Sequence, residues 1–382
     1  MTTFLDLHIL QTVPSSNLNR DDTGSPKTAT FGGVKRARVS SQAWKRATRR
    51  DFGSYLDSSD RGVRTRRIMA DLVGRIRDLD SSLDTETALG LAKDVMAAAA
   101  GIKFEKPKRG KSTDEASTEI DLDLSSYLVF ISNQQLARLA ELALTGRDGT
   151  TIDKAAAKDA LKDGNGIDVA LFGRMIADAP AYNVDAAVQV AHAISTHAVE
   201  TEYDYFTAVD DAKTDEEDAG AGMIGVIEFN SSTLYRYATI NVDQLEENLG
   251  DVDTTVRAVE AFVQSFIESM PSGKQNTFAN GTLPDAVVLQ VRDRAPINLA
   301  GAFESPVLRQ QGEAISTTSA RELAKRSHDI EASFGKTPAA SYLVSGNAAI
   351  AKELDGLGEP VSLADLVTAA GERAREALQE SA

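Results

Sequence analysis

Positively charged side chains gather near the start of this chain, although the sequence as a whole is strongly acidic. Residues 1–50 hold nine Lys or Arg and three Asp or Glu, whereas the whole chain of 382 residues has a net charge of −16. Lysine and arginine bind phosphate groups, which an acidic surface repels. The first fifty residues are therefore the place where this chain could bind a phosphate-containing ligand.

Glycine and serine residues in the same stretch also suit an anion. Gly32 and Gly33 have no side chains, so the backbone there can turn sharply and come close to a ligand. Ser40 or Ser41 is a suitable N-cap for the segment that follows, and the free N–H groups at a helix N-terminus attract anions. Together these residue types predict a phosphate-binding segment.

The segment after Ser41 predicts a helix with one cationic face. At about 100° per residue, its four cations fall within about 140° of one another. They are Lys45, Arg46, Arg49 and Arg50. Trp44 points away from this face, so we expect it to anchor the helix to the core. The alternative interpretation is a basic, solvated helix on an ordinary enzyme.

The composition is that of a globular protein, with 42% hydrophobic and 26% charged residues. There is no cysteine, which excludes disulfides and cysteine-based metal sites and fits a reducing cytoplasm. The N-terminus lacks the features of a signal peptide, and no apolar run approaches the length of about 18 residues that a membrane span needs. We therefore expect a cytoplasmic protein without a membrane partner.

The elements that would position these residues mix strands and helices. A first strand is predicted over 4–10, with Asp6 and His8 on its other side or at a wet edge. A long loop over 11–39 follows it. Helices are predicted over 40–56, 62–79, 85–100, 132–145, 151–162, 184–199, 254–270, 318–335 and 362–379. Strands are predicted over 127–131 and 286–291, and over 223–229 and 234–242 with a short polar turn between them. Without a steady βαβ rhythm, this mixture predicts an α+β fold.

Blocks spread along the chain carry a resemblance to a known family. The blocks are Asn19-Arg20-Asp21, Phe31-Gly32-Gly33, Arg38-Val39-Ser40-Ser41-Gln42, Lys45-Arg46, Asp168–Met175, Ala191–His197, Asp204–Asp211, Tyr235–Ala238, Asn248–Gly250 and Pro271–Thr277. In this order they resemble the backbone subunit of the type I-E CRISPR Cascade complex, the Cas-seven family, also called CasC. The resemblance covers most of the chain.

The resemblance implies a non-catalytic protein that binds CRISPR guide RNA and needs no cofactor. Copies of it would line up head to tail along the RNA and, with the other Cascade subunits, form a surveillance complex for RNA-guided DNA recognition in antiviral defence. The target DNA strand would be met through the guide. The protein would hold the RNA backbone and leave the base edges free to pair.

The resemblance also implies an RRM-like (ferredoxin-like) palm, a helical fingers region and a long thumb hairpin. Residues 1–59 would form the first part of the palm, with the basic loop and helix. Residues 60–180 would form the fingers, with a mobile insertion at 103–119. Residues 181–382 would complete the palm and include the thumb at 196–226 and the C-terminal helices.

Side chains from several of the resembling blocks are expected to contact the RNA. They are Arg20, Lys27, Ser40, Gln42, Lys45, Arg46, Arg49, Arg174, Met175, Lys274 and Gln275. Lys274 and Gln275 suit contacts to a phosphate and a 2′-hydroxyl. Met175 has an alternative role, because methionine is by default a core residue.

Tyr205 and Phe206 stand at the base of the expected thumb. In the family that the chain resembles, the thumb reaches the neighbouring subunit and displaces a guide base, and stacking of a base on an aromatic ring stabilises by about 1–3 kcal/mol. Either residue could make this contact. Alternatively, 196–226 is a long surface loop whose aromatics pack on their own domain. The acidic run at 210–218 departs from the family pattern.

Catalytic motifs for phosphate cleavage or nucleophilic attack are absent from the sequence. The nearest candidate for a metal site consists of His192, His197, Glu200, Glu202 and Asp204. On a helix the two histidines would point about 140° apart, which favours structural histidines and no metal. The alternative function is a metal-dependent ribonuclease that uses a thumb-region carboxylate, Asp204 or Asp210.

Overall fold

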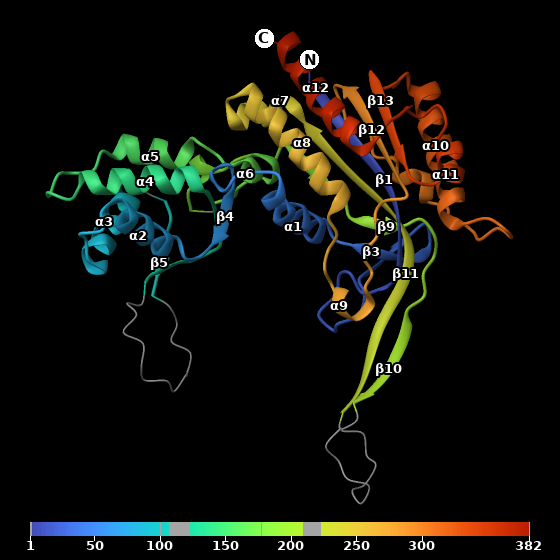
Figure 1. Ribbon diagram of the computed structural model, residues 1–382, viewed down its shortest axis with the longest axis horizontal. Coiled ribbons are helices and arrows are strands. Elements are labelled where there is room, and N and C mark those ends of the chain that lie inside the picture. The colour runs from blue at the N-terminus through green and yellow to red at the C-terminus, as the bar shows by residue number, and fades with distance from the viewer. Residues whose placement is uncertain (1, 100, 107–121, 177, 209–222, 382) are drawn as a thin grey trace, which may run out of the picture. The chain divides into compact units, whose positions relative to one another are not determined.

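The chain divides into two compact units of mixed α+β structure (Figure 1). The computed structural model describes residues 2–99, 101–106, 122–176, 178–208 and 223–381. One unit, here called the sheet unit, comprises Met1–Phe52, Gln189–Val242 and Val259–Ala382. The other, the helical unit, comprises Gly53–Val188 and Asp243–Ala258. The α+β fold class predicted from the sequence is confirmed.

The sheet unit is built on a ten-stranded sheet. Eight of its strands follow the order β14-β13-β12-β1-β11-β9-β3-β2, and the other two, β8 and β10, pair with β11. Its strands are β1 (Thr3–Ser16), β2 (Thr28–Phe31), β3 (Val34–Val39), β8 (Val188–Val190), β9 (Ala193–Ser195), β10 (Glu202–Ala208), β11 (Met223–Asn241), β12 (Ala286–Asp293), β13 (Ala340–Ser345) and β14 (Glu359–Pro360). β1 is antiparallel to both of its neighbours, whereas β13 and β14 are parallel.

Helices cover both faces of this sheet, so the central strand β1 is buried on both sides. They are α1 (Ser41–Asp51), α8 (Val252–Glu268), α9 (Gln275–Phe278), α10 (Ile315–Phe334), α11 (Ala348–Glu353) and α12 (Leu363–Ser381), with a short 3₁₀ helix, η4 (Leu299–Phe303). Leu10 and Tyr235 face the core that η4, α10 and α11 cover. The next residues along each strand, Ile9 and Arg236, face the other way, because strand side chains alternate.

Asp6 and His8 lie on the other face of β1 from Leu5, Leu7 and Ile9, which confirms one of the two predicted alternatives. The wet edge is wrong, because this face lies in the core beneath α10. Both side chains are buried. Asp6 accepts a hydrogen bond from the Tyr237 hydroxyl at 2.9 Å and pairs with Arg292 at 3.1 Å. His8 Nδ1 lies 2.9 Å from the Tyr235 hydroxyl. These partners make the burial of both groups tolerable.

Trp44 fixes α1 to the opposite face of the sheet, as the sequence predicts. Its side chain is fully buried, with its ring 6.4 Å from that of Phe266 in α8. The guanidinium carbon of Arg236 lies 3.7 Å from the Trp44 ring centroid and 4.6 Å from that of Phe266. This buried stack holds the helix that carries three of the candidate RNA-binding cations, Lys45, Arg46 and Arg49.

Three predicted segments differ from the structure because sheet pairing extends strands beyond their local pattern. The segment 11–39 is no long loop, since β1 continues to Ser16 and β2 and β3 form a hairpin. The helix predicted over 184–199 is replaced by β8 and β9. The polar turn expected between 229 and 234 lies inside β11, where Ser232 and Thr233 pair with the polar end of β1.

The helical unit packs four helices around its own hydrophobic core. They are α2 (Ile68–Leu79), α3 (Thr85–Ala99), α4 (Asn133–Thr145) and α5 (Lys154–Lys162). The unit also contains α6 (Ile167–Phe172), most of α7 (Val242–Leu249), the pair β4 (Gly62–Thr65) with β7 (Val129–Ser132), and the pair β5 (Phe104–Glu105) with β6 (Leu124–Ser125). Ser132 and Gln135 form a capping box that starts α4.

Some predicted features fall on residues outside the described ranges. Most of the insertion expected at 103–119 lies in 107–121, and Asp210 and the centre of the expected thumb lie in 209–222. Among the helices that are described, none combines the length and apolar character of a membrane span.

Candidate nucleic-acid interface

The basic hairpin β2–β3 turns on its two glycines. Gly32 and Gly33 have φ of +60° and +79°, and Phe31 pairs with Val34 across them. Two consecutive residues with positive φ are typical of the type I′ turn, which suits glycine. A Cβ on Gly32 would lie 1.6 Å from the carbonyl oxygen of Glu304. The close approach predicted for a ligand is therefore made to the protein's own backbone.

Replacing Gly32 by alanine is expected to destabilise the sheet unit more than replacing Gly33. Both variants place alanine at positive φ, which costs about 1–2 kcal/mol. Only Gly32→Ala adds a clash, because no atom lies within 4 Å of a Cβ on Gly33. Overpacking of this kind costs about 1–3 kcal/mol more. Urea unfolding of the two variants measures the difference, and equal losses would contradict the close packing at Gly32.

Arg36 holds the hairpin from inside the protein. Its side chain is fully buried. Its guanidinium donates to the carbonyl oxygens of Ser195 at 2.8 Å, of Phe303 at 2.7 Å and of Phe31 at 3.2 Å. One of the nine early cations therefore fixes the hairpin to η4 and β9 and does not face a ligand.

A chain of backbone contacts brings the loop after β1 to the start of α1. The side-chain oxygen of Asn19 accepts from the N–H of Ser40 at 2.9 Å, and its carbonyl accepts from the N–H of Lys27 at 2.8 Å. The carbonyl of Lys27 in turn accepts from the N–H of Arg38 at 2.9 Å. The predicted contacts Arg20 and Lys27 thus lie on a loop that is tied to both β3 and α1.

Helix α1 presents its cations at two levels of exposure. Arg46 and Gln42 are exposed, whereas Lys45 and Arg49 are half-buried. Partial burial lowers the pKa of Lys45, because it removes water that would stabilise the ammonium. Ser40 is the N-cap, as predicted, and its hydroxyl oxygen accepts from the N–H of Ala43 at 3.3 Å.

The loop with Lys274 and Gln275 packs against the same region. A Cβ on Gly273 would lie 2.3 Å from the carbonyl oxygen of Leu18, so the two backbones are in close contact. Lys274 has a φ of +52°, which is uncommon for a residue with a side chain and often marks a functional site. Gln275 follows it, exposed, at the first position of α9. Gly273 and Leu18, 255 positions apart in the sequence, thus share one region of the sheet unit.

Arg174 and Met175 lie in the helical unit and differ in exposure to solvent. Arg174 is buried, and its guanidinium donates to the carbonyl of Tyr182 at 2.8 Å and to the side-chain oxygen of Gln135 at 2.9 Å. It is therefore a structural arginine with no free face for RNA. Met175 is 81% exposed, so it is not the core methionine of the alternative interpretation.

Most cations predicted to bind RNA are not engaged by the protein's own carboxylates. Among the described residues, no ion pair involves Arg20, Lys27, Arg46 or Lys274. In a chain of net charge −16, cations without carboxylate partners are available to an external anion.

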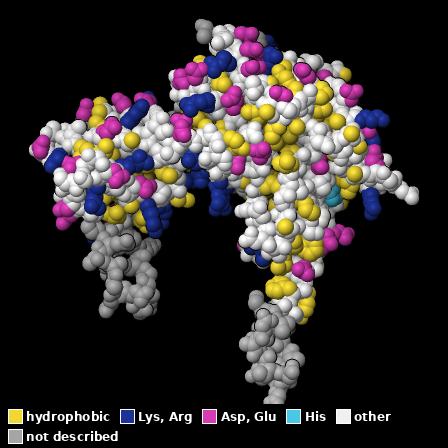
Figure 2. All heavy atoms as spheres, viewed as in Figure 1, with side chains coloured by type: hydrophobic (Ala, Val, Ile, Leu, Met, Phe, Trp, Pro, Cys, Tyr) yellow, Lys and Arg dark blue, Asp and Glu magenta, His cyan; other side chains and the backbone are white. Residues whose placement is uncertain are grey.

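Strands β10 and β11 form a two-stranded ribbon with an apolar face. Tyr205 pairs with Val226 and Tyr203 pairs with Glu228, so these four side chains share one face. Tyr203, Tyr205 and Val226 are 67%, 62% and 59% exposed. Figure 2 shows hydrophobic side chains on the ribbon next to the residues drawn in grey.

Phe206 lies on the opposite face of the ribbon from Tyr205. It pairs with Gly225, and a Cβ on that glycine would lie 2.3 Å from the Phe206 ring. The ring thus covers the glycine and is only partly exposed. The alternative in which all aromatics pack on their own domain is therefore true of Phe206 but not of Tyr205.

The histidines expected at a helix end lie on a strand connection and differ from each other. The N–H of Thr233 donates to His197 Nε2 at 3.1 Å, and His197 Nδ1 donates to the carbonyl of Ala198 at 2.8 Å. His197 is therefore structural, and burial lowers its pKa. His192 is exposed, and its Nδ1 lies 3.0 Å from Arg38 Nη1. Within the described ranges, no group of three or more His, Asp or Glu could hold a metal ion.

Sequence reasoning did not include Arg38 and His192 among the candidate RNA-binding residues, although they contact each other in this region. Arg38 also donates from Nε to the carbonyl of Thr28 at 3.1 Å, so its guanidinium is oriented from two sides. Alternation along a strand would place Arg38 on the face opposite to that of the buried Ala37, and so predict that Arg38 is accessible. This pattern was not used, because the segment 11–39 is predicted as a loop.

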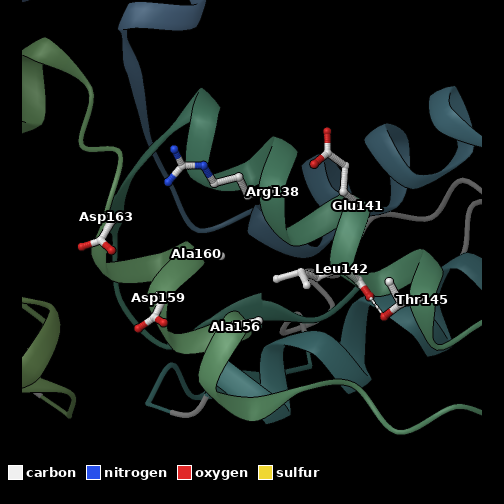
Figure 3. A pocket seen from close by; sticks show the side chains of 8 residues that line it. All are labelled: Arg138, Glu141, Leu142, Thr145, Ala156, Asp159, Ala160 and Asp163. Atoms are coloured by element: carbon white, nitrogen blue, oxygen red, sulfur yellow. Dashed lines mark hydrogen bonds between the residues drawn. The ribbon is translucent and has the colours of Figure 1, made fainter.

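A pocket in the helical unit has the wrong charge for RNA (Figure 3). It lies between α4 and α5, and Leu142, Thr145, Ala156 and Ala160 form part of its lining. The charged residues around it are Arg138, Glu141, Asp159 and Asp163. Three carboxylates and one guanidinium repel phosphate, so the candidate interface stays with the sheet unit.

Comparison with known proteins shows the family to which the chain belongs. The family described as CT1975-like protein matches residues 5–369, nearly the whole chain. The chain belongs to this family. No match was found among the curated proteins with which the sequence was compared.

Two solved structures are similar to the chain over nearly its full length. One, described as "CRISPR RNA-guided surveillance complex, pre-nicking", is 35% identical with a TM-score of 0.83, and the match covers 97% of this chain and 100% of that one. The other, described as "CRISPR RNA-guided surveillance complex", is 31% identical with a TM-score of 0.72, and the match covers 96% and 99%. The CT1975-like chain is thus similar to chains of CRISPR RNA-guided surveillance complexes, whereas the type I-E subtype stays a prediction.

Proposed function

We propose that this protein is the guide-RNA-binding backbone subunit of a CRISPR surveillance complex of the type I-E Cascade class. The observation that carries the proposal is the similarity, over 97% of this chain and 100% of the other, to a chain of a CRISPR RNA-guided surveillance complex. The available cations of the sheet unit support it, because an RNA backbone is a row of phosphates. The protein has no catalytic role in this proposal.

The RNA would run along the surface where β3, α1 and the loops before β2 and before α9 meet. Arg20, Lys27, Lys45 and Arg49 would contact phosphates, with Lys274 beside them. Gln42 and Gln275 would donate to phosphate or 2′-hydroxyl oxygens. Backbone contacts of this kind carry no sequence preference, so the base edges stay free to pair with a target DNA strand.

The units suggest how the palm, fingers and thumb are built. The sheet unit would be the RRM-like palm, and the helical unit the fingers. The β10–β11 ribbon would be the thumb, because its apolar face has no partner among the described residues of the chain. Copies that meet head to tail through such a ribbon make contacts that do not close, which produces a filament along the RNA in a cytoplasmic complex with other subunits.

Tyr205 is the better candidate of the two thumb aromatics for a guide base. Replacing Tyr205 by alanine is expected to weaken assembly on RNA by about 1–3 kcal/mol per subunit, the contribution of one stacked base. Tyr205→Phe keeps the ring and should bind as the wild type does. Sedimentation of the protein with guide RNA over a range of concentrations measures the effect. Phe206→Leu serves as the control on the opposite face, and a larger loss there would contradict the assignment.

Co-expression with a guide locus tests the proposed function. The protein purified from such cells should carry RNA, seen as a high ratio of absorbance at 260 nm to that at 280 nm, and should sediment as a large particle. Ribonuclease treatment should return it to a smaller species. Protein that purifies free of nucleic acid from the same cells would contradict the proposal.

No observation on the described residues favours the alternative of a metal-dependent ribonuclease. Asp204 is exposed on β10, and Asp210 lies outside the described ranges. Incubation of the protein–guide complex with complementary RNA and Mg²⁺ or Mn²⁺ separates the two functions. We expect intact RNA; cleavage that is lost in Asp204→Ala or Asp210→Ala would favour the enzyme.

A further inference from the structure

His192 belongs to a cationic cluster that the fold assembles from three places. It follows β8 and precedes β9, and β9 pairs with β3 so that Arg38 lies opposite Ile194. This register brings Arg38 Nη1 within 3.0 Å of His192 Nδ1. Lys27 acts on the same imidazole by its charge. In the described part of the chain, Arg38 and Lys27 are the charged groups that act on His192.

The contact with Arg38 sets the protonation state of His192 in the free protein. A guanidinium only donates hydrogen bonds, so Nδ1 must accept and the imidazole carries its hydrogen on Nε2. Partial burial, and then the charges of Arg38 and Lys27, lower the pKa of His192. The imidazole is therefore neutral at neutral pH and holds the guanidinium of Arg38 in place.

A bound phosphate reverses this balance. Protonated His192 donates from both nitrogens, so it loses the hydrogen bond from Arg38 and is repelled by it. An anion that accepts from both groups removes the repulsion and favours the charged imidazole. Lys27 lies next to Arg38, because its carbonyl accepts from the N–H of Arg38 at 2.9 Å and both residues line one small cavity. A phosphate beside His192 would therefore meet two further cations.

We propose that His192 is a further phosphate-binding residue of the guide-RNA interface, and that binding of one RNA phosphodiester beside Lys27 and Arg38 takes up a proton at its imidazole. The inference rests on the proposed function and adds a pH dependence to it. RNA binding becomes tighter as the pH falls, because the proton is part of the bound state. Inorganic phosphate offers the same chemistry without the neighbouring contacts.

Imidazole NMR of the full chain measures the proton directly. The sequence has four histidines, so their ring signals can be assigned with single variants. A short single-stranded oligoribonucleotide should move the titration midpoint of His192 upward and leave exposed His328 of α10 unchanged. Inorganic phosphate alone should produce a smaller shift. A midpoint that does not rise with RNA, or a full shift with inorganic phosphate and none with RNA, would overturn the inference.

The pH profile of RNA affinity tests the consequence. His192→Gln keeps a side-chain acceptor for Arg38 but cannot take up a proton, and His328→Gln removes an exposed histidine elsewhere as a matched control. From about pH 8 to pH 6, wild-type affinity should rise up to about tenfold for each unit by which RNA raises the His192 pKa. His328→Gln should follow the wild type, and His192→Gln should lack this rise.

The pH profiles of the wild type and His192→Gln distinguish failure of the proton uptake at His192 from failure of the proposed RNA binding. If His192→Gln keeps the full pH dependence, the proton is taken up elsewhere and the inference fails, while RNA binding and the proposed function stand. If the wild type binds no RNA at any pH, the proposed function fails as well.

Discussion

Trp44→Ala should lower the free energy of unfolding of the sheet unit by about 3–5 kcal/mol, as expected for loss of a large buried aromatic side chain. Trp44 is fully buried, and Arg236 and Phe266 stack on it between α1 and the sheet. The change leaves a cavity and removes the cation–π contact of a buried guanidinium. Because α1 carries Lys45 and Arg49, RNA affinity should fall with stability.

Gln42→Ala on the same helix is the matched control for stability. Gln42 is exposed, so its replacement should change the free energy of unfolding by less than about 0.5 kcal/mol. Guanidinium unfolding, followed by the signal of near-ultraviolet circular dichroism, compares both variants with the wild type. A loss below about 1 kcal/mol for Trp44→Ala would show that the stack does not fix α1.

The double variant Lys45→Ala with Arg49→Ala should remove two phosphate contacts. Four contacts to single-stranded RNA imply a slope of log affinity against log salt near −3 per subunit, at about −0.7 each, and a fall of roughly fifty-fold from 50 to 200 mM salt. The double variant should have a slope about 1.4 less steep and bind roughly sixty-fold more weakly at 50 mM salt. Fluorescence anisotropy with a labelled oligoribonucleotide measures both.

Lys325→Ala with Lys336→Ala is the control for net charge. It removes two exposed cations of the sheet unit on and just after α10, away from the candidate interface. Its salt slope should equal that of the wild type. If the two double variants lose the same amount of slope, the effect comes from net charge, and Lys45 and Arg49 do not contact RNA.

Local signals made α1 predictable. Ser40 and the 3.6-residue pattern after it specify the helix, its cap and the buried side of Trp44, because these depend on residues a few positions apart. The type I′ turn at Gly32 and Gly33 is equally local, yet the sequence analysis predicts a close approach to a ligand there and not a hairpin turn. A glycine pair between two short strands is first of all a hairpin signal.

The roles of individual arginines depended on contacts between distant parts of the chain. Arg36 and Arg174 resemble any other cation in the sequence, but both donate to backbone carbonyls in the interior. The contact of Arg38 with His192 exists only because β3 pairs with β9. Sequence periodicity reports which side of an element is buried, not which partner from elsewhere covers it.

Ultraviolet crosslinking of the protein to its guide RNA, followed by mass analysis of the crosslinked peptides, tests the position of the RNA most directly. Crosslinks should fall in peptides from 17–50 and from 271–279, which the fold brings together in the sheet unit. Crosslinks confined to α10, α11 and α12, with none in 17–50, would contradict RNA binding by the basic amino-terminal surface.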